Sequence, residues 1–101
     1  MYYKFTSDIT RLGPILTPYV LEIDDNYVRY SRRNKNLLNK DRITIPIDII
    51  SSVNIDASLL GTTLTITGYG LADIIIRKLN IQDAYTIQEV LNHRRGEIIK
   101  K

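Results

Sequence analysis

Hydrophobic and polar residues alternate along most of the chain, with the period of two that is typical of half-buried β-strands. Six segments carry this alternation: residues 19–24, 27–31, 42–47, 51–56, 62–67 and 73–78. Asp24-Asp25-Asn26 separates the first two segments, and these residue types favour a tight turn, so we expect a hairpin there. Gly68-Tyr69-Gly70 is interpreted as a second turn, because glycine adopts backbone angles that other residues avoid.

Three places depart from simple alternation. Ile74-Ile75-Ile76 makes both faces of its strand apolar, and we expect a helix to cover one of them. Pro46 has no backbone N–H, which puts it at an edge, a bulge or the end of its strand. Residues 1–17 allow either a short strand or one helical turn around Tyr3, Phe5 and Ile9.

An amphipathic helix that begins after Asn80 is the clearest element of the sequence. Asparagine is a preferred N-cap residue, and Asp83 in the first turn suits the positive end of the helix dipole. The apolar stripe consists of Ile81, Ala84, Ile87, Val90 and Leu91. Gly96 is expected to end the helix. The tail, 96–101, then either adds a strand to a neighbour or frays, and we expect it to fray.

These elements predict one mostly β domain of six or seven antiparallel strands, arranged as a barrel or a sandwich and closed by the C-terminal helix. The domain covers residues 18–95, between an N-terminal extension at 1–17 and the tail at 96–101. The 101 residues are enough for one modest core. The isoleucine-rich composition, with seven tyrosines and no tryptophan, also favours strands.

The composition narrows the class of protein. The absence of cysteine excludes disulfides, cysteine-based metal sites and thiol nucleophiles, and it fits a reducing cytoplasm. No segment approaches the roughly 18 apolar residues of a membrane-spanning helix, and the first residues lack a signal-peptide core. We therefore expect a soluble, cytoplasmic protein. The net charge of +3 is too small to indicate a nucleic-acid partner.

Catalysis finds little support in the sequence. His93, the only histidine, lies near the helix end among arginines, where the helix dipole favours a positive charge. Asp24 and Asp25 could hold a hard cation, but a tight turn requires the same residues. Residues 68–70 lack the strand-to-helix context of a phosphate-binding loop. We predict no enzymatic activity, no metal and no cofactor.

A basic cluster between residues 29 and 42 is the strongest surface feature. Its members are Arg29, Arg32, Arg33, Lys35, Lys40 and Arg42. The surrounding segment, 31–41, is polar and asparagine-rich, so we expect a loop without regular structure. Such a cluster either attracts phosphate groups, anionic lipid or an acidic protein, or only keeps the loop solvated. Nucleic acid is disfavoured, because the alternation leaves only Tyr27 exposed for stacking beside Arg29.

Two sequence motifs span predicted strands and the connections between them. Residues 43–55 read I-T-I-P-I-D-I-I-S-S-V-N-I, and Ser58-Leu59-Leu60-Gly61 is followed by Leu64-Thr65-Ile66. The first resembles the I-P-x-x-x-I-S-S-V strand pair of bacterial pleckstrin-homology (PH) domains, and the second resembles the hairpin of the same family. The resemblance covers residues 18–95. The chain departs from the family in Thr62-Thr63, which replace a glycine-rich strand start, and in lacking the preceding membrane helices of many members.

The resemblance implies a PH-like fold, a superfold that hosts lipid, peptide and self-association surfaces alike. We expect a non-catalytic interaction module that binds protein partners, or further copies of itself, through sheet edges or the groove beside the helix. The alternative is peripheral binding to anionic membranes, or to phosphate-bearing ligands, through residues 29–42. In eukaryotic PH domains a basic early hairpin loop binds phosphoinositide headgroups, which motivates this alternative.

Overall fold

The computed structural model describes residues 1–6, 19–33, 40–59, 61–70 and 72–99, except the side chains of residues 33, 40, 41 and 99. The elements are β1 (Tyr3–Thr6), β2 (Tyr19–Ile23), β3 (Tyr27–Arg33), β4 (Lys40–Pro46), the 3₁₀ turn η1 (Ile47–Ile49), β5 (Ile50–Ser58), β6 (Gly61–Gly68), β7 (Ile74–Leu79) and the helix α2 (Ile81–Ile99). The prediction of a mostly β protein with a C-terminal helix is confirmed.

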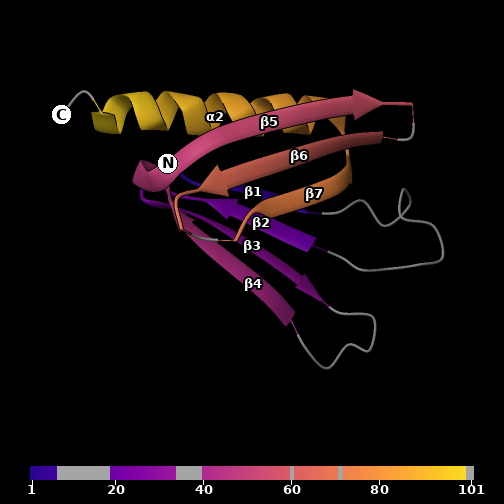
Figure 1. Cartoon of the computed structure of the whole chain (residues 1–101), viewed down its shortest axis with the longest axis horizontal. Helices are drawn as coiled ribbons and strands as arrows, with labels where there is room; N and C mark the ends of the chain where they lie inside the picture. Colours follow the sequence, from indigo (N-terminus) through magenta and orange to yellow (C-terminus); the bar gives the residue numbers. More distant parts are fainter. Residues whose placement is uncertain (7–18, 34–39, 60, 71, 100–101) are drawn as a thin grey trace.

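The strands form two antiparallel sheets, with the orders β1-β2-β3-β4 and β5-β6-β7 (Figure 1). Each sheet is a meander, in which neighbours in sequence are neighbours in space. Among the described strands no backbone ladder joins the two sheets, so they do not close into one continuous barrel. The N-terminal segment contributes β1, which resolves the choice between a strand and a helical turn for residues 3–6 in favour of the strand.

The alternation of the sequence decides which side chains form the core. Tyr19, Leu21 and Ile23 of β2 are buried together with Val28 and Tyr30 of β3, as predicted. The inward residues of β5, β6 and β7 join them in one cluster, to which α2 contributes Ala84, Ile87 and Leu91. Burial of this cluster holds both sheets and the helix together, because the removal of apolar surface from water is the dominant stabilising term in folding.

The strands extend further than expected on either side of the basic cluster. The predicted loop at 31–41 is wrong at both ends, because β3 continues to Arg33 and β4 begins at Lys40. The ladder pairs Ser31 with Arg42 and Arg33 with Lys40, and these backbone hydrogen bonds outweigh the weak local preference of the polar residues for a loop. Pro46 ends β4, one of the positions predicted for it.

The helix α2 begins where the sequence predicts and ends later. The Asn80 Oδ1 accepts a hydrogen bond of 2.8 Å from the Gln82 N–H, which confirms the N-cap. Gly96 does not end the helix, contrary to the prediction, and its φ is not positive, as a C-terminal glycine cap requires. Ile98 is partly buried against the core, two turns beyond Leu91 on the same face. This burial offsets the roughly 1 kcal/mol that glycine costs inside a helix.

The helix does not cover the outer face of β7, as the three consecutive isoleucines suggested. It packs against β5, η1 and β6 (Figure 1). Ile75 is 40% exposed, while Ile74 and Ile76 are buried on the inner face. Ile81 is also 44% exposed, so the stripe of α2 begins at Ala84 rather than at its first residue. Among the described residues, no helix combines the length and apolar character that crossing a bilayer requires.

The turn between β2 and β3 is stabilised by one carboxylate. The Asp24 Oδ1 accepts hydrogen bonds of 2.8 Å from the N–H groups of both Asn26 and Tyr27. Its Oδ2 lies 2.5 Å from the Arg29 Nη1. The Asn26 N–H, assisted by the Tyr27 N–H and the Arg29 guanidinium, holds the pKa of the Asp24 carboxyl below its usual range.

The packing of α2 makes a stability prediction. Leu91→Ala should lower the free energy of unfolding by roughly 2–5 kcal/mol, because the side chain is fully buried and the neighbouring elements cannot close the cavity completely. Chemical denaturation measures this change. The control is Ile81→Ala at the exposed start of the helix, which should cost about 0.5 kcal/mol or less. Equal effects of the two substitutions would contradict the described packing.

The hydrogen-bonded carboxylate of Asp24 in the β2–β3 turn should make the stability of the protein depend on pH in acid. The pKa of Asp24 is lower in the folded than in the unfolded state, so the ionised carboxylate stabilises the folded protein. This contribution is complete above the unfolded pKa of about 3.9 and is lost as the pH falls through the folded pKa. Asp24→Asn should therefore be less stable than the wild type at pH 7, and this difference should shrink in acid. Urea denaturation between pH 2 and pH 7 checks it, and a constant difference would refute it.

Candidate functional site

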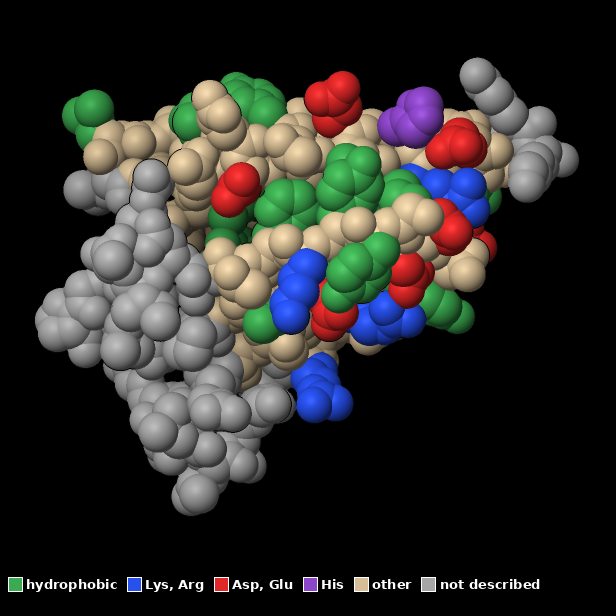
Figure 2. Space-filling view, turned by 180° about the vertical axis from the view of Figure 1, so that it is seen from behind, with side chains coloured by type: hydrophobic (Ala, Val, Ile, Leu, Met, Phe, Trp, Pro, Cys, Tyr) green, Lys and Arg blue, Asp and Glu red, His purple; other side chains and the backbone are tan. Residues whose placement is uncertain are grey.

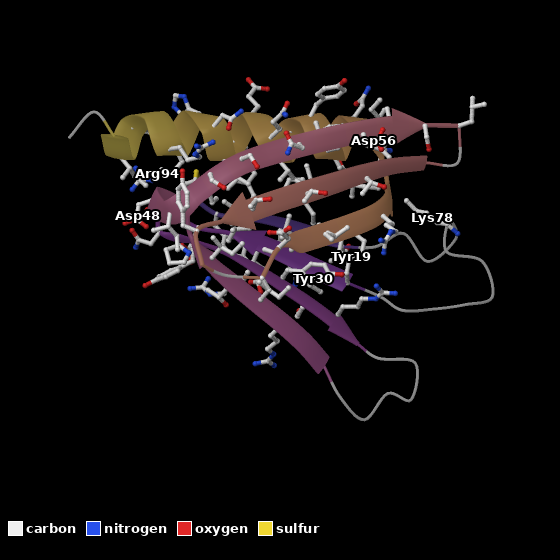
Figure 3. The ribbon with its side chains drawn as sticks, in the orientation of Figure 1. Tyr19, Tyr30, Asp48, Asp56, Lys78 and Arg94 are labelled. Carbon is white, nitrogen blue, oxygen red and sulfur yellow. The ribbon has the colours of Figure 1, made fainter. Side chains whose placement is uncertain are left out.

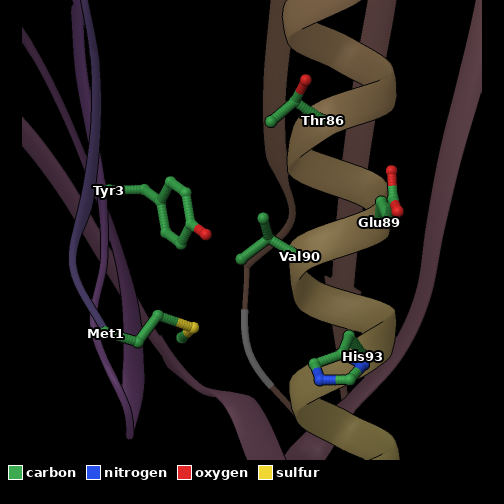
Figure 4. Close-up of a pocket in the computed structure, with 6 residues that line it drawn as sticks. All are labelled: Met1, Tyr3, Thr86, Glu89, Val90 and His93. Atoms are coloured by element: carbon green, nitrogen blue, oxygen red, sulfur yellow. The ribbon is translucent and has the colours of Figure 1, made fainter.

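A groove of about 460 Å³ lies between β1 and α2. Met1 and Tyr3 line its strand side, and Thr86, Glu89, Val90 and His93 line its helix side (Figure 4). Figure 2 shows hydrophobic side chains gathered between the helix and the neighbouring strand. The volume falls within the range of roughly 300–1,000 Å³ that is usual for binding pockets in proteins.

The register of β1 places Tyr3 in this groove. Tyr3 pairs with Ile23, and Phe5 pairs with Leu21, so both aromatic side chains lie on the inner face of the sheet. Phe5 packs on the core, whereas Tyr3 lies closer to the strand's start and is 40% exposed. The two rings stack with centroids 6.5 Å apart, which fixes the orientation of Tyr3 toward α2.

The helical repeat brings the four helix-side residues into one row. Thr86, Glu89, Val90 and His93 are spaced three, four and seven residues apart, which is one face of an α-helix. Val90 is partly buried and supplies an apolar surface opposite Tyr3 (Figure 4). The Thr86 hydroxyl donates to the Gln82 carbonyl, 2.9 Å away, so the threonine presents mainly its methyl group to a ligand.

Glu89 and His93 form the polar rim of the groove. Glu89 is exposed, and within the described part of the chain no cation pairs with its carboxylate. The His93 Nε2 lies 3.5 Å from the Glu97 Oε1 on the next turn. The Glu97 Oε2 also lies 3.9 Å from the Arg94 Nη1, so Glu97 is already paired and Glu89 supplies the negative charge at the rim of the groove.

The opposite side of α2 covers the free edge of β5. The Gln88 Nε2 donates to the Val53 carbonyl, 2.9 Å away, and the Arg95 Nη2 lies 3.5 Å from the Ser51 carbonyl. These carbonyl groups would otherwise be available to an additional strand. The helix thus blocks the edge of β5 with its own side chains. Arg94 Nε in turn donates to the Asp25 carbonyl at 2.8 Å, which ties the last turns of α2 to the β2–β3 turn (Figure 3).

Two other sheet edges also carry features that oppose pairing. On β4, Pro46 lacks a backbone donor and Arg42 is exposed, both of which disfavour an added strand. On β7, the ladder is irregular between Thr62 and Leu64, and Lys78 has a positive φ of 57°. This kink ends the regular edge of β7 after a few residues. Among the described strands, β1 is the edge that borders the groove; it is short and carries an exposed lysine, Lys4.

The structure describes only part of the basic cluster predicted as a site, because Lys35 and the side chains of Arg33 and Lys40 lie outside the described residues. Arg29 is neutralised by Asp24, and its guanidinium also lies 5.2 Å from the centre of the Tyr27 ring. Arg32 and Arg42 are exposed on β3 and β4. Arg33 and Lys40 are paired positions of the same two strands, whereas Lys35 lies outside the described residues.

The described residues include no arrangement of three or more His, Cys, Asp or Glu side chains that could hold a metal ion. His93 is exposed, and its Nε2 lies 3.5 Å from the Glu97 Oε1 on its own helix. Because α2 continues to Ile99, His93 does not lie in the last turn, contrary to the prediction. The smaller pocket of about 250 Å³, which Asn26, Tyr27, Pro46, Asp48 and Ile98 line, lies at the end of the sheet near the last turn of α2.

A binding groove beside the helix is expected from the sequence, but the residues that line it are not. The signal for it was present in the alternation of Tyr3 and Phe5 with Lys4 and Thr6, which is the period of a strand. No local pattern indicates that this strand lies opposite Val90, because that contact depends on how the sheets and the helix pack.

Comparison with known proteins gives no family for the chain, since no family model, no curated protein and no solved structure matches it.

Proposed function

We propose that this protein is a non-catalytic interaction module with a PH-like fold, and that it binds protein segments in the groove between β1 and α2. A four-stranded meander, a three-stranded meander and a C-terminal helix follow one another in the order expected for that superfold, which supports the fold assignment. The observation that carries the function is the groove itself, which lies between the sheet edge at β1 and a half-apolar face of α2.

The chemistry of the groove suits a protein ligand. Tyr3 and Val90 provide apolar contact at its centre, and Glu89 and His93 provide a polar rim. Protein interfaces commonly have this anatomy, with an apolar centre that excludes water and polar groups around it. Tyrosine is enriched among the residues that dominate binding energy, because it combines a large apolar surface with a hydroxyl group.

A displayed library of random peptides tests the proposal. Peptides selected on the wild type should lose at least about tenfold in affinity for Val90→Asp, because a charge at the centre of the groove must be desolvated. The matched control is Ile75→Asp on the outer face of β7, which should bind the same peptides as the wild type. If no selected peptide depends on Val90, the proposed function is wrong.

A second candidate function is binding to anionic membranes through the basic residues of β3 and β4. The supporting observation is the register, which brings basic positions of two neighbouring strands to one end of the sheet: Arg33 opposite Lys40, and Arg42 opposite Ser31. The ion pair between Arg29 and Asp24 weakens this candidate, because it neutralises the basic residue nearest the other end of β3.

Vesicle binding distinguishes this candidate from the first. If the basic cluster contacts the membrane, replacing Arg32, Arg33 and Lys35 together by glutamine should weaken binding to phosphatidylserine vesicles about a hundredfold, since each basic residue contributes roughly 1 kcal/mol. Replacing Arg77 and Lys78 on β7 by glutamine is the control and should have a smaller effect. Co-sedimentation at low salt is the measurement. A wild type that ignores these vesicles eliminates the candidate.

A further inference from the structure

We propose that the ligand of the groove binds as an additional β-strand, hydrogen-bonded to the open edge of β1, and that it is an extended peptide with alternating apolar and basic residues. This inference rests on the proposed protein-binding function and specifies its mode. It follows from three features of the described residues: the direction of the backbone groups of β1, the features that oppose pairing at the edges of β5 and β7, and the exposed carboxylate of Glu89 on α2.

The hydrogen-bond pattern of the sheet identifies the free backbone groups of β1. The Asp24 N–H donates to the Tyr27 carbonyl at 3.0 Å, so this pair is hydrogen-bonded. Hydrogen-bonded pairs recur at every second residue of an antiparallel ladder, so the backbone groups of Ile23 and Leu21 are directed away from β3 and toward β1.

The same alternation then applies to β1. Ile23 and Leu21 are the register partners of Tyr3 and Phe5, whose N–H and C=O groups are therefore used by β2. The N–H and C=O groups of Lys4 and Thr6 are directed to the open edge. An added strand would lie about 4.8 Å from β1 and so would run along the groove beside Tyr3 and Val90.

The edge of β1 is also the sheet edge best placed to pair with an added peptide strand. Gln88 and Arg95 occupy carbonyl groups at the edge of β5, and the positive φ of Lys78 distorts β7. The edge of β4 ends at Pro46, which has no donor, and none of its described residues lines the groove. The groove is bounded by α2 on its far side, so it accommodates one strand rather than the edge of a second sheet. A single extended peptide is therefore the occupant, in the mode known as β-strand addition.

The side chains around the groove define the sequence of the peptide. Every second residue of an added strand is directed toward the floor, where Tyr3 and Val90 favour apolar side chains. The intervening residues are directed toward the rim, where the exposed Glu89 has no described cation paired with it, whereas Glu97, two turns further along α2, is paired with His93 and Arg94. Lysine or arginine at these positions gives the complementary charge.

A blocked octapeptide of alternating valine and lysine, labelled with fluorescein, tests this inference by fluorescence polarisation. Lys4→Pro removes the edge N–H but leaves the donors that β2 uses, and proline is tolerated on a strand edge that faces solvent. We expect Lys4→Pro to weaken binding about tenfold or more, because it removes a hydrogen bond and adds a ring at the edge. The matched control, Lys4→Ala, keeps the N–H and should bind like the wild type.

Two further measurements separate strand addition from simple occupation of the groove. The peptide N-methylated at alternate residues keeps its side chains and should bind at least about tenfold more weakly. Hydrogen exchange of the Thr6 amide should slow when the unmodified peptide is added. Glu89→Gln should weaken binding about threefold at low salt, whereas Asp56→Asn, an exposed acid on β5, should not.

The inference is wrong if the wild type does not bind the octapeptide, if Lys4→Pro binds as well as Lys4→Ala, or if N-methylation has no effect. These failures are distinct from failure of the proposed function. Selected library peptides that depend on Val90 but tolerate N-methylation would retain the groove as a protein-binding site and eliminate strand addition. Absence of any peptide that depends on Val90 would eliminate both.

Discussion

The helix α2 lies against β5 with Ala84, Ile87 and Leu91 buried, and this one contact has two consequences. The buried side chains complete the core that both sheets share. The side chains on the flank of the same helix, Gln88 and Arg95, contact carbonyl groups at the edge of β5. Without the helix, part of the core would be exposed to water, and a long strand edge would be open to association. The groove beside β1 exists because α2 sits over β5 and leaves the facing edge uncovered.

The sequence predicts the strands well wherever one face of the strand is buried and the other is exposed to solvent. The alternation in residues 19–31 and 62–67 gives both the strands and their buried faces, because a period of two leaves only one set of residues directed inward. The start of α2 was equally predictable, since the Asn80 cap acts within a single turn. These features depend on neighbours in the chain, which a sequence pattern describes directly.

The predictions fail where distant packing outweighs a local preference. Gly96 is a sound helix terminator by itself, but the burial of Ile98 extends the helix beyond it. Ile75 is as hydrophobic as Ile74 and Ile76, so the run of three isoleucines does not indicate whether a helix covers the outer face of β7. The groove shows the same limit. Tyr3 and Val90 are separated by most of the chain, and only the arrangement of the sheets and the helix brings them to one surface.

The protection of the sheet edges also governs how far an assembly could grow. A fibre forms when each molecule both accepts a strand and offers a new accepting edge to the next. Among the described strands, the side chains of α2 occupy the edge of β5, the backbone kink at Lys78 distorts the edge of β7, and the edge of β4 ends at Pro46, which has no donor. A peptide seated beside β1 would present its outer edge to the wall of the helix. Pairing at that position would therefore be self-terminating, so the proposed peptide site would not lead to polymerisation through β1.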